Sequence, residues 1–195
     1  MVSLSALVEG QNPRSIDLIL TYTTAFLCSI VVLVAMTWLQ PSIPWTWTQL
    51  IIAFLLTSDL IGGVISNLTH STNSYYQKST QASILFLLAH GIQPLVMVGF
   101  FDMSWNCFWF LYVYMLVSCG VVRWCLGANG LTSAYSEYQS QVAACFMVLG
   151  MVVSSTCGLQ SSSNQIMSWF PAVYFVKLIY AFSVNHYHPQ QQYSK

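Results

Sequence analysis

The hydrophobic positions of this chain form long runs that are separated by short polar stretches. Six runs approach the roughly 20 residues that an α-helix needs to cross a bilayer. They cover 17–39, 46–66, 82–101, 103–122, 141–159 and 166–185. The pattern predicts an all-α integral membrane protein, a bundle of six transmembrane helices that forms a single domain over 1–195.

Prolines and one aspartate mark the predicted helix ends. Pro41 and Pro44 end the first helix and open the second, because proline lacks a backbone N–H and is tolerated only in the first turn. The third and fourth runs are nearly continuous, and one helix over both would overshoot the bilayer about twofold. We divide the runs at 101–104 and expect Asp102 to cap the helix that follows.

Composition excludes a soluble protein. Hydrophobic residues make up 56% of the 195 residues and charged residues only 5%, whereas soluble domains carry about 25% charged residues. The net charge is zero, and no basic stretch indicates nucleic acid. The six cysteines form no CxxC pattern and read as small buried side chains. The sequence identifies no cofactor.

Basic residues predict the orientation of the bundle. Arg14, Lys78, Arg123 and Lys195 all fall on one side of the six-span arrangement, as expected if both termini are cytoplasmic. Six of the seven tryptophans fall near the opposite helix ends, where indole rings favour the headgroup level; these are Trp38, Trp45, Trp47, Trp105, Trp109 and Trp169. We expect an integral protein of the plasma (cytoplasmic) membrane.

Three ionisable residues lie inside the predicted spans: Asp59, His90 and Lys177. Counting about 1.5 Å per residue from the inner helix ends places all three about 10–13 Å deep, in one layer. A charge at this depth is unfavourable by about 2.5–3.5 kcal/mol even on lenient scales, so each residue should face the bundle and have a partner. The sequence therefore predicts an Asp59–Lys177 pair with His90 close by.

Further polar residues share faces with this layer. Asn67 lies two turns after Asp59 on the same helix face, and Gln93 shares a face with His90. Pro94 frees the carbonyl of His90 from its usual helical bond. Tyr174 and Tyr180 flank Lys177 at three residues on either side. The candidate substrate- or ion-binding set is therefore Asp59, His90, Lys177, Gln93, Tyr174, Tyr180 and Asn67.

Small residues recur at helical spacing in two spans and predict close helix packing. In the second span they are Ser58, Gly62 and Gly63; in the fifth they are Gly150, Ser154 and Gly158. A weaker cluster contains His70, His186 and His188, all assigned to the inner interface. Neutral imidazole is a common metal ligand, but solvated interfacial histidines are the preferred interpretation, so no metal site is predicted.

Several functions fit this pattern. The first hypothesis is a small-solute or proton/ion-coupled transporter or permeation protein, in which Asp59 and His90 bind a proton or cation and Lys177 competes as an internal counter-charge. The alternatives are an intramembrane enzyme acting on a lipid or apolar small molecule, and a non-catalytic subunit or assembly factor whose ion pair only fixes helix packing. A retinal Schiff base with its counter-ion would need seven spans. The expected partners are the lipid bilayer and a small molecule or ion, not nucleic acid; an oligomer or a partner subunit is compatible with the sequence.

Overall fold

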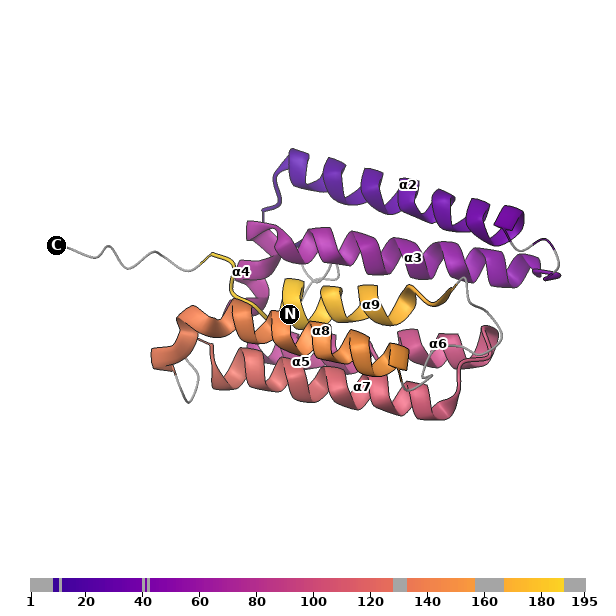
Figure 1. The fold of residues 1–195 in the computed structure, drawn as a ribbon. Coiled ribbons are helices and arrows are strands. Elements are labelled where there is room, and N and C mark those ends of the chain that lie inside the picture. Colours follow the sequence, from indigo (N-terminus) through magenta and orange to yellow (C-terminus); the bar gives the residue numbers. More distant parts are fainter. Residues whose placement is uncertain are drawn as a thin grey trace.

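The computed structural model describes residues 9–10, 12–39, 41, 43–127, 133–156 and 167–187, and every regular element in these ranges is helical (Figure 1). In chain order they are α2 (Ser15–Leu39), α3 (Trp47–Leu68), α4 (His70–Lys78), α5 (Thr80–Ala89), α6 (Ile92–Phe100), α7 (Trp105–Gly120), the π-helix η1 (Val121–Cys125), the 3-10 helix η2 (Ser133–Tyr138), α8 (Gln139–Thr156), α9 (Phe170–Phe175) and the π-helix η4 (Val176–Phe182).

Five helices within the described residues are long and apolar enough to cross a membrane, which confirms the all-α membrane class. They are Ser15–Leu39, Trp47–Leu68, Thr80–Phe100, Trp105–Cys125 and Ser136–Thr156. The last apolar helix, Phe170–Phe182, is shorter, and residues 157–166 before it lie outside the described ranges. Apolar helices of this length are typical of buried core positions as well as of partial spans, so the count of six spans stays a prediction.

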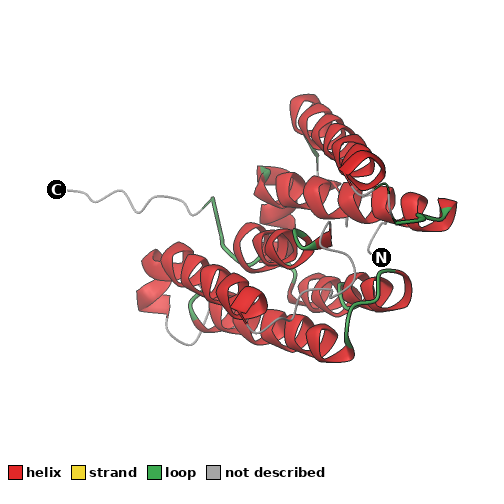
Figure 2. Ribbon diagram, turned by 45° about the vertical axis from the view of Figure 1, so that its right-hand side comes forward, coloured by secondary structure: helices red, strands yellow, loops and turns green. Residues whose placement is uncertain are grey.

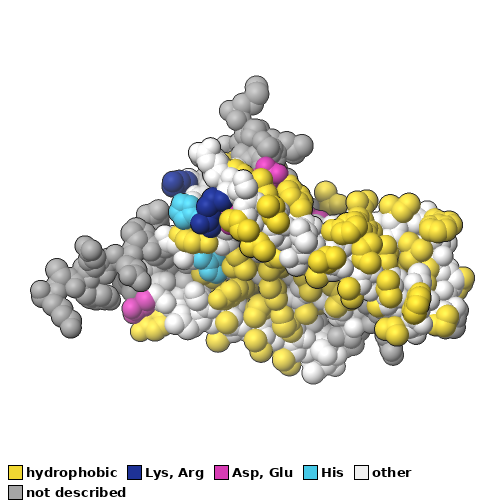
Figure 3. Space-filling view, turned by 90° about the horizontal axis from the view of Figure 1, so that it is seen from above, with side chains coloured by type: hydrophobic (Ala, Val, Ile, Leu, Met, Phe, Trp, Pro, Cys, Tyr) yellow, Lys and Arg dark blue, Asp and Glu magenta, His cyan; other side chains and the backbone are white. Residues whose placement is uncertain are grey.

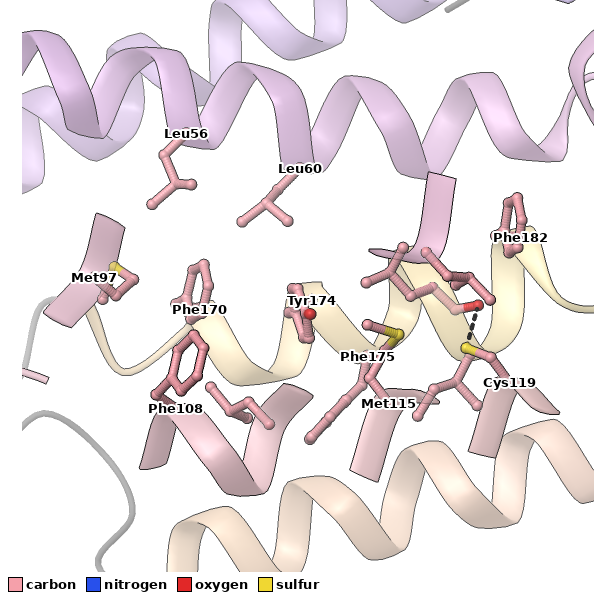
Figure 4. Packing of buried hydrophobic residues seen from close by; sticks show 14 of the residues in the cluster. Leu56, Leu60, Met97, Phe108, Met115, Cys119, Phe170, Tyr174, Phe175 and Phe182 are labelled. Carbon is pink, nitrogen blue, oxygen red and sulfur yellow. Dashed lines mark hydrogen bonds between the residues drawn. The ribbon is translucent and has the colours of Figure 1, made fainter. Parts of the chain in front are cut away.

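The segment from α9 to η4 occupies the centre of the bundle. It contacts α3, α7 and α8, and Figure 2 shows it enclosed by longer helices. Its buried side chains recur at helical spacing on more than one face: Phe170, Tyr174, Phe175, Leu178, Ile179 and Phe182. Figure 4 shows Leu56 and Leu60 of α3 pointing toward the rings of Phe170 and Tyr174. A helix that is apolar nearly all round is buried on all sides.

α2 lies along α3 at the edge of the bundle (Figure 1). Gly62 permits this approach, because a Cβ built at Gly62 would lie 3.2 Å from the Cβ of Ala25. One turn away, the hydroxyls of Ser29 and Ser58 are 2.7 Å apart and hydrogen-bonded. Small residues and a shared hydroxyl contact are what hold helices together where lipid offers no hydrophobic driving force.

The small residues of α8 have a different neighbour. Gly150 packs against aromatic rings, and a Cβ built there would lie 2.7 Å from Tyr114 and 2.8 Å from Phe175. Ser154 is buried and donates a hydrogen bond to the carbonyl of Met151 at 2.9 Å. Gly158 lies outside the described residues.

Hydroxyl groups define two helix starts, one of them against expectation. Thr46 and Gln49 form a capping box at the start of α3. α7 is capped by Ser104, whose hydroxyl accepts from the backbone N–H of Cys107 at 3.2 Å. The prediction of an Asp102 cap is therefore wrong. Asp102 instead adopts a positive φ of 54° in the turn, a conformation that aspartate tolerates better than most residues.

The packing at Gly62 gives a first test. We expect Gly62→Leu to lower the thermal unfolding midpoint in detergent, because overpacking a tight contact is destabilising by about 1–3 kcal/mol. Gly99→Leu is the matched control: nothing lies within 4 Å of a Cβ built there, and replacing a helical glycine stabilises by about 0.5–1 kcal/mol. Equal midpoints for the two variants would show that α2 is not held against α3 at this point.

Candidate functional site

The ammonium group of Lys177 lies inside the bundle on η4, and its side chain is 2% exposed. Nζ donates to the carboxylate oxygen Oδ2 of Asp59 at 3.0 Å and to the backbone carbonyl of Asp59 at 3.1 Å. The lysine stem passes directly over Gly63, where a Cβ would collide with it. A glycine one turn after Asp59 therefore leaves the space through which Lys177 reaches its partner.

Asp59 is held from two sides but is not enclosed. Its Oδ2 atom accepts both from Lys177 and from the side-chain amide of Gln93 on α6. Its side chain is nevertheless 55% exposed, and no hydrogen bond from the described residues reaches its second oxygen, Oδ1. The pair thus joins a buried cation to a carboxylate that faces outward on one side.

His90 sits at a break in the helical segment that carries it. α5 ends at Ala89, and α6 begins only at Ile92. Pro94 has no N–H to donate to the carbonyl of His90, and this carbonyl instead accepts from the hydroxyl of Tyr174 at 3.2 Å. The α-helical hydrogen bonding is thereby interrupted beside the charged pair, although His90 and Gly91 keep right-handed helical dihedral angles.

The tautomer of His90 follows from its neighbour. Nδ1 lies 2.6 Å from the carbonyl oxygen of Phe86, which can only accept, so Nδ1 carries the proton. In the neutral ring, Nε2 then offers a lone pair, and no hydrogen bond within the described part of the chain uses it. His90 also interacts electrostatically with both Asp59 and Lys177.

The remaining predicted layer residues divide into two groups. Asn67 belongs to the site through the backbone, because its amide donates to the carbonyl of Lys177 at 3.4 Å. Tyr174 belongs to the site through the hydrogen bond from its hydroxyl to the carbonyl of His90. Tyr180 lies elsewhere, with its ring 5.4 Å from that of His186.

A second buried cation was missed by the sequence reasoning, which assigned it to an inner loop. Arg123 lies in η1 and is 6% exposed. Its guanidinium donates to the backbone carbonyl of Tyr76 and to the hydroxyl of Ser83, and it lies 5.2 Å from the ring centre of Phe182. The one available signal was that Arg123 directly follows the apolar run 103–122.

The candidate metal ligands do not assemble in the part of the chain that the structure describes. His70 contacts the ring of Tyr187 at 4.9 Å, and His186 lies against Tyr180. Burial lowers the pKa of His186 below its usual value, which favours its neutral form. His188 lies outside the described residues, and no group of three or more metal-ligating side chains occurs within them.

Comparisons of the chain with protein-family models, with curated proteins and with solved structures give no match. The geometry of the charged layer therefore carries the functional argument alone.

The Asp59–Lys177 contact predicts a double-mutant cycle in which the two single substitutions destabilise the protein unequally and their effects do not add. Breaking a buried pair from one side is destabilising by up to about 3–5 kcal/mol, whereas replacing both partners is often nearly neutral. We expect Asp59→Asn to lower the unfolding midpoint in detergent more than Lys177→Met, because it leaves the fully buried charge without a counter-ion. The double variant should be more stable than Asp59→Asn. Strictly additive losses would show that the two side chains do not interact.

Proposed function

We propose that this protein is a six-span integral protein of the plasma membrane, with both termini cytoplasmic, that moves a small solute, proton or ion across the bilayer. The observation that supports this proposal most is the irregular backbone on two sides of the charged layer. His90 and Gln93 flank the break between α5 and α6, while Lys177 lies in the π-helix η4. Interrupted helices are frequent at the binding sites of transporters, and π-helical turns are frequent at functional sites.

The exchange of partners at Asp59 supplies a mechanism. In the closed arrangement the carboxylate is neutralised by Lys177. A proton or cation arriving at Asp59 weakens its hold on the ammonium, and the released ammonium would be free to attract an anion or to move with η4. The break at His90 permits α5 and α6 to shift relative to one another without stretching a continuous helix.

The charge distribution supports the proposed orientation. Figure 3 shows Lys, Arg and His side chains gathered at one end of the face formed by α2 and α3, while most of the rest of this face is hydrophobic. Arg14 and Lys78 belong to helix starts and ends at that end of the bundle. A cluster of basic residues at one membrane surface is expected on the cytoplasmic side.

The rival functions have less support. Ser58 would be the nearest nucleophile for an intramembrane enzyme, but its hydroxyl is engaged with Ser29 between α2 and α3. A purely structural role is favoured by one observation, because the Asp59–Lys177 bond fastens the central segment to α3. A transport assay separates this role from the proposed one.

Topology is tested with reporter fusions. Fusions after residue 195 and within 68–80 should report the cytoplasm, and a fusion at 161–163 should report the opposite side, because the positive-inside rule then holds for the whole chain. A cytoplasmic signal at 161–163 would contradict the six-span arrangement and leave the central segment as a re-entrant or buried helix.

Transport is tested in vesicles that enclose a pH-sensitive dye. We expect the reconstituted protein to dissipate an imposed pH gradient, and Asp59→Asn to reduce the rate to that of protein-free vesicles, because the proton-accepting carboxylate is gone. Asp17→Asn is the matched control, since Asp17 pairs with Arg14 at the start of α2, outside the charged layer.

The double variant Asp59→Asn with Lys177→Met separates folding from transport, because it removes the pair without leaving a buried charge. It should fold and fail to carry protons. If it retains the wild-type rate, the pair is structural and the assembly-factor hypothesis takes first place.

A further inference from the structure

The atoms of the charged layer that remain without a partner are all hydrogen-bond acceptors. Gln93 must turn its NH₂ group toward the carboxylate of Asp59, so its Oε1 atom stays buried without a partner. Asp59 Oδ1 and His90 Nε2 likewise receive no hydrogen bond from the described residues. On its exposed side the layer presents the Oδ1 atom of Asp59, so a ligand that binds there has to bring hydrogen-bond donors.

The open side of Asp59 points out of the bundle. Ile51, Leu55 and Asp59 recur every fourth residue on α3, a spacing that places them in one row, and all three are more than half exposed. Ile92, next to Gln93, is exposed as well. In a bilayer this row faces the hydrocarbon region, where an unpaired carboxylate oxygen is unfavourable.

An apolar groove is lined by two residues of this row, Ile51 and Leu55. It lies between α2 and α3, has a volume of about 390 Å³ and ends at Leu55, one turn before Asp59. This volume falls in the range of small-molecule sites, roughly 300–1,000 Å³. Its lining is Ile30, Leu33, Val34, Thr37, Trp47, Leu50, Ile51, Phe54 and Leu55.

The lining also decides which occupant fits. The one hydroxyl in it, that of Thr37, already donates to its own helix, so apart from the indole of Trp47 the lining is apolar. Large branched and aromatic side chains do not offer the small-residue surface on which transmembrane helices approach most closely. A flexible hydrocarbon chain needs neither polar contacts nor a close backbone approach.

We propose that this groove and Asp59 together bind a lipophilic primary amine, which enters sideways from the bilayer. The hydrocarbon tail lies between α2 and α3, and the ammonium head donates to Asp59 Oδ1. An ammonium brings three N–H donors and no acceptor, and its arrival at Oδ1 weakens the hold of Asp59 on Lys177, which contacts Oδ2. This inference rests on the proposed transport function, for which it names the substrate class.

The test measures saturable binding of radiolabelled decylamine to the full-length protein in phosphatidylcholine nanodiscs, after subtraction of the uptake by empty nanodiscs. Unlabelled decylamine should compete. Decyltrimethylammonium, which has the charge and the tail but no N–H, should compete at least about tenfold more weakly, as should decanol with its single donor, because hydrogen bonds to a charged group are each worth about tenfold or more in affinity.

Two variants locate the site. Asp59→Asn should weaken decylamine binding at least about tenfold, whereas Asp17→Asn should leave it unchanged. The competitor series uses the unaltered protein, so it decides the question even if Asp59→Asn folds poorly. Nanodiscs that contain phosphatidylethanolamine, whose headgroup carries a primary ammonium, show whether a lipid headgroup or a free amine takes the site.

Besides an absence of saturable decylamine binding, three results would overturn the inference. Equal competition by decyltrimethylammonium removes the requirement for donors. Equal competition by decanol leaves only an apolar groove for acyl chains. Unchanged binding by Asp59→Asn places the ammonium elsewhere. If the vesicles show proton movement that depends on Asp59 while decylamine does not bind, the inference fails and the proposed function stands. If decylamine binds but the vesicles show no proton movement, the inference stands and the proposed function fails.

Discussion

The bond between Lys177 and Asp59 is the contact on which the arrangement of the central helix depends. A membrane interior supplies no water to solvate an ammonium group, so the buried Lys177 needs partners inside the bundle, and Asp59 supplies a carboxylate and a backbone carbonyl. Asp59 lies on α3 and Lys177 on η4, so the requirement fixes the rotation and the height of the central segment against α3. Gly63 is then required as well, because any side chain there would occupy the path of the lysine.

The two buried cations share a backbone feature. Lys177 lies in the π-helix η4 and Arg123 in the π-helix η1. A change of helical type leaves carbonyls without their usual partners, and in a membrane these carbonyls must be satisfied internally. Side chains supply the bonds here: the carbonyl of Leu178 accepts from Ser183 at 2.8 Å and from Cys119 at 3.4 Å, as Figure 4 shows for the latter.

Sequence reasoning succeeded for features that depend on the length of a hydrophobic run and on the depth of a residue within it. Hydrophobic length predicted the five long helices, and counting residues along the helices placed Asp59 and Lys177 at one level, where the structure has them in contact. It failed where two nearby groups compete for one role. Asp102 and Ser104 could both have capped α7, and the choice depends on the φ angle of the turn, which hydropathy does not encode. The burial of Arg123 depends on acceptors from α4 and α5, far away in sequence.

The exposure of Asp59 carries the functional argument further than its pairing does. An ion pair that served only to fasten two helices would gain from complete burial of both groups, because lipid-facing charge is unfavourable and water cannot compete inside the bundle. Here the cation is enclosed, whereas the side chain of the anion is 55% exposed, one turn after Leu55 of the groove lining. Since Lys177 contacts only Oδ2, the carboxylate can accept from an incoming ligand at Oδ1 before it releases its internal partner. This asymmetry is what a site that exchanges partners requires and what a permanent clamp does not.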